Sequence, residues 1–218
     1  CAETIRIMAE AGERAGMPKG LIACMTKVTL PGTQELMKHK YVALILATGG
    51  SDMVRAAHSV GKPAYGVGPG NVPAYVDRSA DVAQAAKYIV ASKAFDHSVI
   101  CATEQAVVAD RPIAAQLEEM MKAEGAYFVD DNIKQILAKN LFVGHLPNPK
   151  GVGKSPQQLA QQYGFSVPDW ARILVVRLNS VGRDEPLSGE KLTTVLGWYE
   201  VDGWEEGCER SLELINYG

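Results

Sequence analysis

The sequence predicts an α/β protein in which a parallel sheet carries helices on its faces. Two observations lead to this fold class. Short apolar runs alternate along the chain with segments of helical periodicity, which is typical of parallel sheets. The 218 residues, 47% of them hydrophobic, also suffice for one large or two small cores. The alternation, followed in order, assigns each element.

The first third of the chain opens with a helix. Over residues 2–15, Ile5, Met8 and Gly12 share one face, and Pro18 closes the segment. The elements expected next are a strand at 21–25, a helix at 33–40, a buried strand at 42–47 and a helix at 52–60. This part therefore already alternates between helix and strand.

The rest of the chain continues the alternation. Ser79 is a suitable N-cap for an alanine-rich helix that runs through to Ala94, and Pro112 suits the first turn of a later helix. A stretch rich in glycine and proline, 141–155, is expected to run over the surface. The other expected elements are strands at 73–77, 105–109, 126–129, 172–178 and 194–201, and helices at 112–123, 155–163 and 204–215.

Composition argues against several kinds of partner. The formal net charge of -3 and the lack of a basic run give no field that would gather nucleic acid. The longest apolar stretch, 41–47, is far shorter than the roughly 20 residues that span a bilayer. The four cysteines lack C-x-x-C pairs and histidine partners at ligand spacing, so neither disulfides nor a metal site are expected. We expect a cytoplasmic protein and, because the chain opens with Cys1 inside a predicted helix, a piece of a longer or processed one.

Three glycine-rich segments are candidate ligand loops. Thr48-Gly49-Gly50-Ser51 separates a predicted strand from a predicted helix, where backbone N–H groups and the helix dipole favour a phosphate. The same residues also make an ordinary turn with an N-cap, and both readings stay open. The segment 66–71 has an asparagine where the dinucleotide fingerprint needs its third glycine. The segment 151–155 imitates the end of a P-loop without its first glycine and is expected to be a solvated loop.

Cys101 is the candidate nucleophile. It lies at the junction between a predicted helix and a predicted strand, a good position for a reactive side chain. An isolated cysteine beside Ile100 and Ala102 is, however, more often a small buried residue. His97 can serve as its base, although a lone histidine beside an aspartate is more often simply solvated.

These segments together resemble the CoA-acylating aldehyde dehydrogenases. The family includes the acylating half of bifunctional aldehyde/alcohol dehydrogenases and the propionaldehyde and acetaldehyde dehydrogenases of bacterial microcompartments. The resemblance covers essentially the whole chain. It rests on Thr48-Gly49-Gly50, on Gly61-Lys62-Pro63-Ala64-Tyr65-Gly66-Val67-Gly68-Pro69-Gly70-Asn71, on Phe95-Asp96 with Val99-Ile100-Cys101-Ala102, and on Glu185-Pro186-Leu187 with Glu190-Lys191-Leu192.

The resemblance implies an aldehyde dehydrogenase-like fold in two parts. Residues 1–70 would be the C-terminal part of a Rossmann-type NAD-binding domain, and residues 71–218 a catalytic domain truncated at its C-terminal end. The asparagine with which the family stabilises the oxyanion would precede Cys1, which leaves the Cys101 N–H for that role. The chain alone is therefore expected to be inactive.

The resemblance also implies a reaction. The Cys101 thiolate would add to a short-chain aldehyde, the thiohemiacetal would give hydride to NAD, and coenzyme A would take the acyl group from the resulting thioester. The implied cofactor contacts are Thr48, Gly49, Gly50, Ser51, Val67, Gly68, Glu185 and Leu187, with Glu185 on the nicotinamide ribose. A homo-oligomer is implied for the full-length protein, in the cytoplasm or within a bacterial microcompartment.

One position separates acyl transfer from hydrolysis. Hydrolytic relatives carry a glutamate general base where the ungapped match places Val67. Water, with a pKa near 15.7, needs such a base, whereas a thiol with a pKa of about 8.5 supplies its own nucleophile. Val67 therefore favours coenzyme A. The alternatives are a hydrolytic enzyme that uses another carboxylate, such as Glu104, and a non-catalytic subunit in which Cys101 is merely packed.

Overall fold

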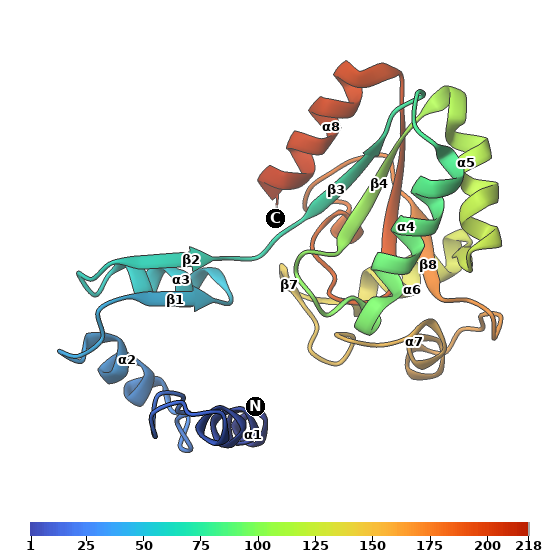
Figure 1. Cartoon of the computed structure of the whole chain (residues 1–218). Helices are drawn as coiled ribbons and strands as arrows, with labels where there is room; N and C mark the ends of the chain where they lie inside the picture. The colour runs from blue at the N-terminus through green and yellow to red at the C-terminus, as the bar shows by residue number, and fades with distance from the viewer. Residues whose placement is uncertain (218) are drawn as a thin grey trace. The chain divides into compact units, whose positions relative to one another are not determined.

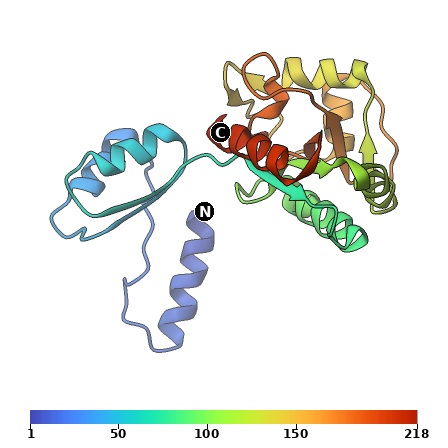
Figure 2. The ribbon, with the colours of Figure 1, turned by 90° about the horizontal axis from the view of Figure 1, so that it is seen from above.

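The computed structural model describes residues 1–217, which form two compact units that divide between Gly68 and Pro69 (Figures 1 and 2). We call residues 1–68 unit 1 and the remainder unit 2. The division falls close to the boundary expected after Gly70. Each unit has hydrophobic core residues of its own.

Unit 1 contains a small parallel sheet. Its elements are α1 (Ala2–Arg14), α2 (Leu30–Lys38), β1 (Ile45–Thr48), α3 (Ser51–His58) and β2 (Ala64–Val67). Strands β1 and β2 run parallel, with Thr48 opposite Val67. Only four core residues are buried: Met37, Ile45, Ala47 and Ala57.

Unit 1 departs from the expected pattern in two places. Residues 21–25, expected as a strand, form a bend followed by irregular structure, and Leu21 is exposed. A short apolar run does not specify a strand without a neighbour to pair with. Strand β2 was not expected because Gly66 interrupts it. A Cβ at Gly66 would lie 2.3 Å from the Val54 side chain, so this glycine lets α3 pack directly on the strand backbone.

Unit 2 is built on a five-stranded sheet. Its strands have the order β3-β4-β9-β8-β5, and every neighbouring pair is parallel. The strands are β3 (Val72–Val76), β4 (Glu104–Asp110), β5 (Ala126–Phe128), β8 (Ile173–Arg177) and β9 (Val195–Val201). The helices are α4 (Val82–Ala94), α5 (Arg111–Ala123), α6 (Asp131–Asn140), α7 (Pro156–Tyr163) and α8 (Gly203–Tyr217), with short 3₁₀ turns at η1 (Phe95–Ser98) and η2 (Pro186–Ser188).

Helices cover both faces of this sheet, as Figure 1 shows for α4 and α8. Successive residues of β4 serve opposite cores. Val107 and Ala109 pack with α4 and α5, whereas Ala106 and Val108 pack with α6, α7 and α8. A strand buried on both faces reads as an unbroken apolar run, which is why the sequence revealed it.

Two parts of unit 2 differ from expectation. Helix α6 was missed because only Ile133 and Leu137 of its ten residues are buried, too thin a stripe to show helical periodicity. The stretch expected to run over the surface instead contributes Leu141 to the core and includes a small hairpin of β6 (Phe142–Val143) and β7 (Leu146–Pro147).

Candidate active site around Cys101

Cys101 lies in the turn that leads into β4. Because all five strands are parallel, this turn belongs to the edge at which every strand of the sheet begins. The cysteine is partly exposed. A Cβ at Gly70 would approach the Cys101 carbonyl oxygen to 3.2 Å, so glycine lets the chain entering β3 run close to the cysteine backbone.

The backbone before Cys101 has an unusual conformation. Asp96, His97 and Ser98 have φ angles of 48°, 50° and 62°, in the left-handed region that L-residues seldom occupy. The buried Ser98 hydroxyl lies 2.7 Å from the Thr103 hydroxyl, which donates to the Ile100 carbonyl at 2.9 Å. These bonds close a compact loop around Cys101, which we call the cysteine turn, residues 98–103.

A buried polar cluster adjoins this turn. The Gln105 side-chain oxygen accepts from Lys93 Nζ at 3.3 Å and from the Lys191 backbone N–H at 3.1 Å. Lys191 Nζ donates to the Leu187 and Gly189 carbonyls, each at 2.8 Å. The sequence contained Lys191 in the family-like segment, but nothing in the sequence indicated that it would be buried beside Gln105.

Burial dominates the electrostatics of this cluster. It lowers the pKa of Lys191 to about 7, against the opposing effect of Glu190 and Glu185. Burial, followed by the like charge of Lys191, lowers the pKa of Lys93 well below its usual range. Burial raises the pKa of Glu190, whose carboxylate oxygen lies 3.4 Å from the Gly70 N–H. All three shifts favour neutral side chains at this edge of the sheet.

The predicted cofactor residues of unit 1 lie together at the ends of its two strands. Thr48 is the register partner of Val67, and the Gly49 N–H donates to the Val67 carbonyl at 3.1 Å. Helix α3 starts at Ser51 with Gly50 as its N-cap, and no side chain caps its first N–H groups in the part of the chain that the structure describes. Gly68 follows β2 directly. These residues thus form a glycine-rich turn before a helix N-terminus.

The predicted cofactor residues of unit 2 have other contacts. Glu185 forms an ion pair with Lys134 at 2.8 Å. Leu187 is fully buried in the core on the face of the sheet that α6, α7 and α8 cover, so its side chain offers no accessible surface to a cofactor. The placement of Leu187 therefore does not support the expected contact. Glu190, to which the sequence analysis gave no role, accepts a hydrogen bond from the Gly70 N–H. Gly70 in turn lies against the Cys101 backbone.

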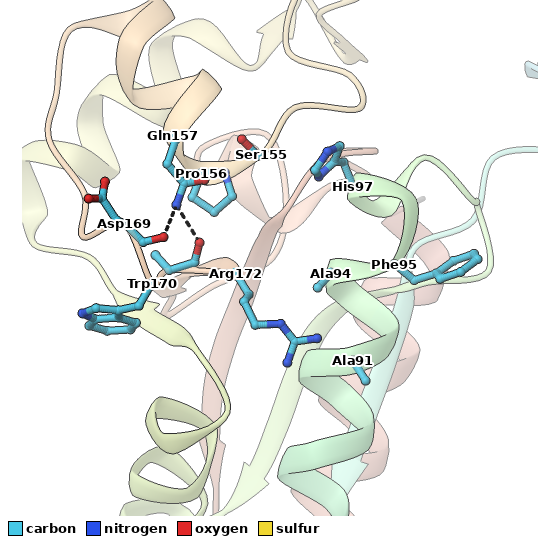
Figure 3. A pocket seen from close by; sticks show the side chains of 11 residues that line it. Ala91, Ala94, Phe95, His97, Ser155, Pro156, Gln157, Asp169, Trp170 and Arg172 are labelled. Carbon is cyan, nitrogen blue, oxygen red and sulfur yellow. Dashed lines mark hydrogen bonds between the residues drawn. The ribbon is translucent and has the colours of Figure 1, made fainter.

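A pocket of about 420 Å³ opens beside the start of the cysteine turn (Figure 3). Phe95 and His97 line it from one side, and Trp170 and Arg172 from another. Gln157 donates to the Ala171 carbonyl at 2.8 Å at its rim. His97, the candidate base, therefore has its imidazole on this pocket.

The segment that imitated a P-loop leads into α7. Ser155 is the N-cap of that helix, and its hydroxyl and the Gln158 side chain form a reciprocal capping box. The Gly153 N–H donates to the Leu192 carbonyl at 2.9 Å, and Gly151 is buried. Residues 151–155 are thus packed rather than fully solvated, and the Ser155 hydroxyl is occupied in capping.

Within residues 1–217, no group of three histidine, cysteine, aspartate or glutamate side chains is placed to hold a metal ion. None of the helices in that range combines the length and the apolar character needed to cross a bilayer. Glu104, the alternative base, has one carboxylate oxygen buried without a partner among the described residues.

A helix-covered parallel sheet with a cysteine at its amino edge, following a smaller α/β unit with a glycine-rich turn, defines a two-unit α/β protein with a candidate thiol site. Residues 2–148 match the model of the aldehyde dehydrogenase family. The chain belongs to that family. It therefore has the aldehyde dehydrogenase-like fold that the sequence resemblance implied, and this expectation is confirmed.

Individual relatives share this fold. An aldehyde-alcohol dehydrogenase of Streptococcus pneumoniae is 40% identical over 99% of this chain and 26% of its own length. The crystal structure of an acetylating aldehyde dehydrogenase from Geobacillus thermoglucosidasius superposes with a TM-score of 0.95 at 48% identity, over 100% of this chain and 48% of its own. The structure of a propionaldehyde dehydrogenase from Rhodopseudomonas palustris, solved with bound CoA and an acylated cysteine, superposes with a TM-score of 0.85 at 30% identity. The match covers 96% of this chain and 48% of that one. The chain spans about a quarter of the first relative and half of the other two.

Proposed function

We propose that the chain is part of a CoA-acylating aldehyde dehydrogenase that converts a short-chain aldehyde, NAD+ and CoA to acyl-CoA and NADH. The observation that carries this proposal is Cys101, partly exposed in a turn whose hydrogen bonds hold it at the edge of the sheet. The named activities of the relatives, and the acylated cysteine in one of them, support the same chemistry.

In the proposed reaction Cys101 is the nucleophile. Its thiolate sulfur forms a bond to the aldehyde carbon, and the carbonyl oxygen becomes the oxyanion of a thiohemiacetal. NAD+, when bound, accepts the hydride that leaves this carbon, which turns the adduct into a thioester. The CoA thiol loses its proton to solvent and attacks the thioester carbon as a thiolate. The bond from that carbon to the Cys101 sulfur breaks, and Cys101 departs as a thiolate. The Cys101 N–H is the backbone donor proposed for the oxyanion.

The cofactor contacts are proposed on separate grounds for each unit. In unit 1, the helix start behind Thr48, Gly49, Gly50 and Ser51 suits a phosphate because its N–H groups lack a capping side chain among the described residues. Val67 ends the neighbouring strand and Gly68 follows it, where the same ligand would pass. The apolar Val67 supplies no base, which supports CoA rather than water as the acceptor.

In unit 2, Glu185 is proposed to reach the nicotinamide ribose only if the cofactor competes with Lys134 for its carboxylate. Glu190 is the better placed of the two glutamates, because its contact with Gly70 brings it toward Cys101. A homo-oligomer, and residence in the cytoplasm or a bacterial microcompartment, remain predictions. One structural neighbour comes from such a microcompartment.

The first experiment measures NADH formation by the complete product of the gene that encodes this chain. The substrates are propionaldehyde and NAD+, with and without CoA, and the variants are Cys101→Ala and Cys208→Ala. Cys208 is an exposed cysteine on α8 and provides the matched control. We expect a signal that needs CoA, disappears in Cys101→Ala and persists in Cys208→Ala.

Other outcomes identify the alternatives. NADH formed equally well without CoA would favour a hydrolytic enzyme. The buried, unpaired oxygen of Glu104 would then make it the base to test by Glu104→Gln. Activity that survives Cys101→Ala would contradict the proposal, and inactivity of every form would favour a non-catalytic subunit.

A further inference from the structure

We infer that Gln105 is a positioning residue for Cys101. Its carboxamide joins the end of α4, the segment before β9 and the cysteine turn, and thereby sets the place of the thiol. This inference rests on the proposed function, since it assumes that Cys101 is the nucleophile. It assigns a role to a buried amide that takes no part in the chemical steps above.

The contacts of Gln105 reach three separate segments. The residue is fully buried near the start of β4. Its oxygen is shared by Lys93 Nζ, from α4, and by the backbone N–H of Lys191. Its Nε2 points to the Thr103 carbonyl at 3.5 Å, a long contact that adds orientation rather than strength. One amide thus connects both buried lysines to the cysteine turn.

Thr103 continues this connection to Cys101. Its hydroxyl forms hydrogen bonds with the Ser98 hydroxyl and the Ile100 carbonyl. The Thr103 N–H also donates to the Ile100 carbonyl, so Cys101 lies within a turn closed by these hydrogen bonds. Three preceding residues have positive φ, a conformation that is unfavourable for residues other than glycine and persists only where the surroundings enforce it. A backbone so strained keeps its shape only while the contacts that enforce it persist. Thr103 supplies such a contact to Ser98, and Gln105 in turn contacts the Thr103 carbonyl.

Two substitutions of Gln105 separate the effect of its hydrogen bonds from that of its packing. The groups around it are Lys93 from α4, Lys191 and Glu190 from the segment before β9, and Glu104 from β4 itself, with Glu185 acting on Lys191. Gln105→Glu keeps an acceptor oxygen for both donors, whereas Gln105→Met keeps the length and loses both polar groups. The two variants therefore separate hydrogen bonding from packing.

The test measures kcat and aldehyde KM per titrated active site in the complete gene product. It also measures the rate at which iodoacetamide alkylates Cys101 relative to Cys208, followed by peptide mass spectrometry. For Gln105→Met we expect kcat to fall about 100-fold, because a misplacement of about 1 Å is sufficient for such a loss. The KM for the aldehyde should stay within about threefold of its original value. The kcat of Gln105→Glu should be at least about tenfold higher than that of Gln105→Met.

A second pair of variants guards against misfolding of Gln105→Met. Thr103→Val removes the bridging hydroxyl and should reproduce the loss of kcat, while Thr103→Ser keeps it and should recover most of the rate. Unchanged kcat per titrated site in both Gln105→Met and Thr103→Val would overturn the inference. Activity in Cys101→Ala would instead overturn the proposed function, so the two failures are distinguishable.

Discussion

Lys191 shows what a residue-scale reading of the sequence could and could not provide. The sequence showed a lysine within a family-like segment, but burial depends on strands that meet only in the fold. In the structure its side chain is buried, and its Nζ donates to two carbonyls of its own loop. The helix–strand junction made Cys101 a candidate, and only the family resemblance assigned it as the nucleophile. The role inferred for Gln105 depends on contacts with residues 12 and 86 positions away.

The lowered pKa of Lys191 makes stability depend on pH. Its pKa is about 7 in the folded chain and near 10.4 when unfolded. Between these values the unfolded state binds more protons, so the free energy of unfolding rises with pH, by about 2 kcal/mol from pH 7 to 9 for this group. We expect Lys191→Met to reduce that rise, as measured by urea unfolding followed through tryptophan fluorescence.

Lys87→Met provides the control for this prediction, because Lys87 is an exposed lysine on α4. Its pH dependence should match that of the unmodified chain. All three tryptophans lie in unit 2, so the fluorescence reports the unit that contains Lys191. Equal slopes in Lys191→Met and Lys87→Met would show that Lys191 is not the group responsible.

At the scale of elements, prediction succeeded where a segment carries its own start signal or an unbroken apolar run. The periodicity of α4 and α7 and the doubly buried β4 are of this kind. The N-cap expected for α4 at Ser79 was wrong: the helix begins at Val82 with Asp81 as its N-cap, whose side chain accepts from the Gln84 N–H. Ser79 instead donates to the Asp77 carboxylate. Helix α6 failed because few of its residues are buried, although Asp130 caps it through its side chain. A capping residue alone thus does not identify a helix in the sequence; enough of its residues must also be buried to give a periodic apolar pattern.

The α7 cap allows an element-scale prediction. Ser155→Ala removes the hydroxyl that accepts from the Gln158 N–H at 3.2 Å and should lower the free energy of unfolding by about 1 kcal/mol. Denaturant unfolding measures the change. Ser180→Ala is the control, because Ser180 is exposed and its backbone carbonyl accepts from Tyr199. A cost no larger than that of the control would refute the importance of the cap.

At the scale of the whole molecule, the sequence predicted alternating helices and strands but not the order of the strands. Periodicity says which segments are strands and leaves open which of them are neighbours. The position of Cys101 at the amino edge follows from the all-parallel pairing. Parallel α/β sheets generally bind ligands at the opposite, carboxyl edge, as the Thr48 turn of unit 1 would do, so a general rule would have misplaced the thiol.

The two units should differ in their ability to fold alone. Unit 2 has two cores on a five-stranded sheet, whereas unit 1 buries four core residues on a two-stranded one. A two-stranded sheet with so small a core is marginal in water. We expect residues 69–218 expressed alone to unfold cooperatively on heating and residues 1–68 to show no cooperative transition by circular dichroism. A sharp transition in the shorter piece would contradict this expectation.

The strand order of unit 2 also determines when the protein can fold during synthesis. Strand β9 occupies the middle of the sheet, between β4 and β8, yet it is the last of the five strands in the sequence. Until the ribosome has released it, β3 with β4 and β5 with β8 are two separate pairs, each with an apolar edge strand open to solvent. The nascent chain must therefore wait for residues 195–201 before the sheet can close, and chaperone protection matters most during that interval.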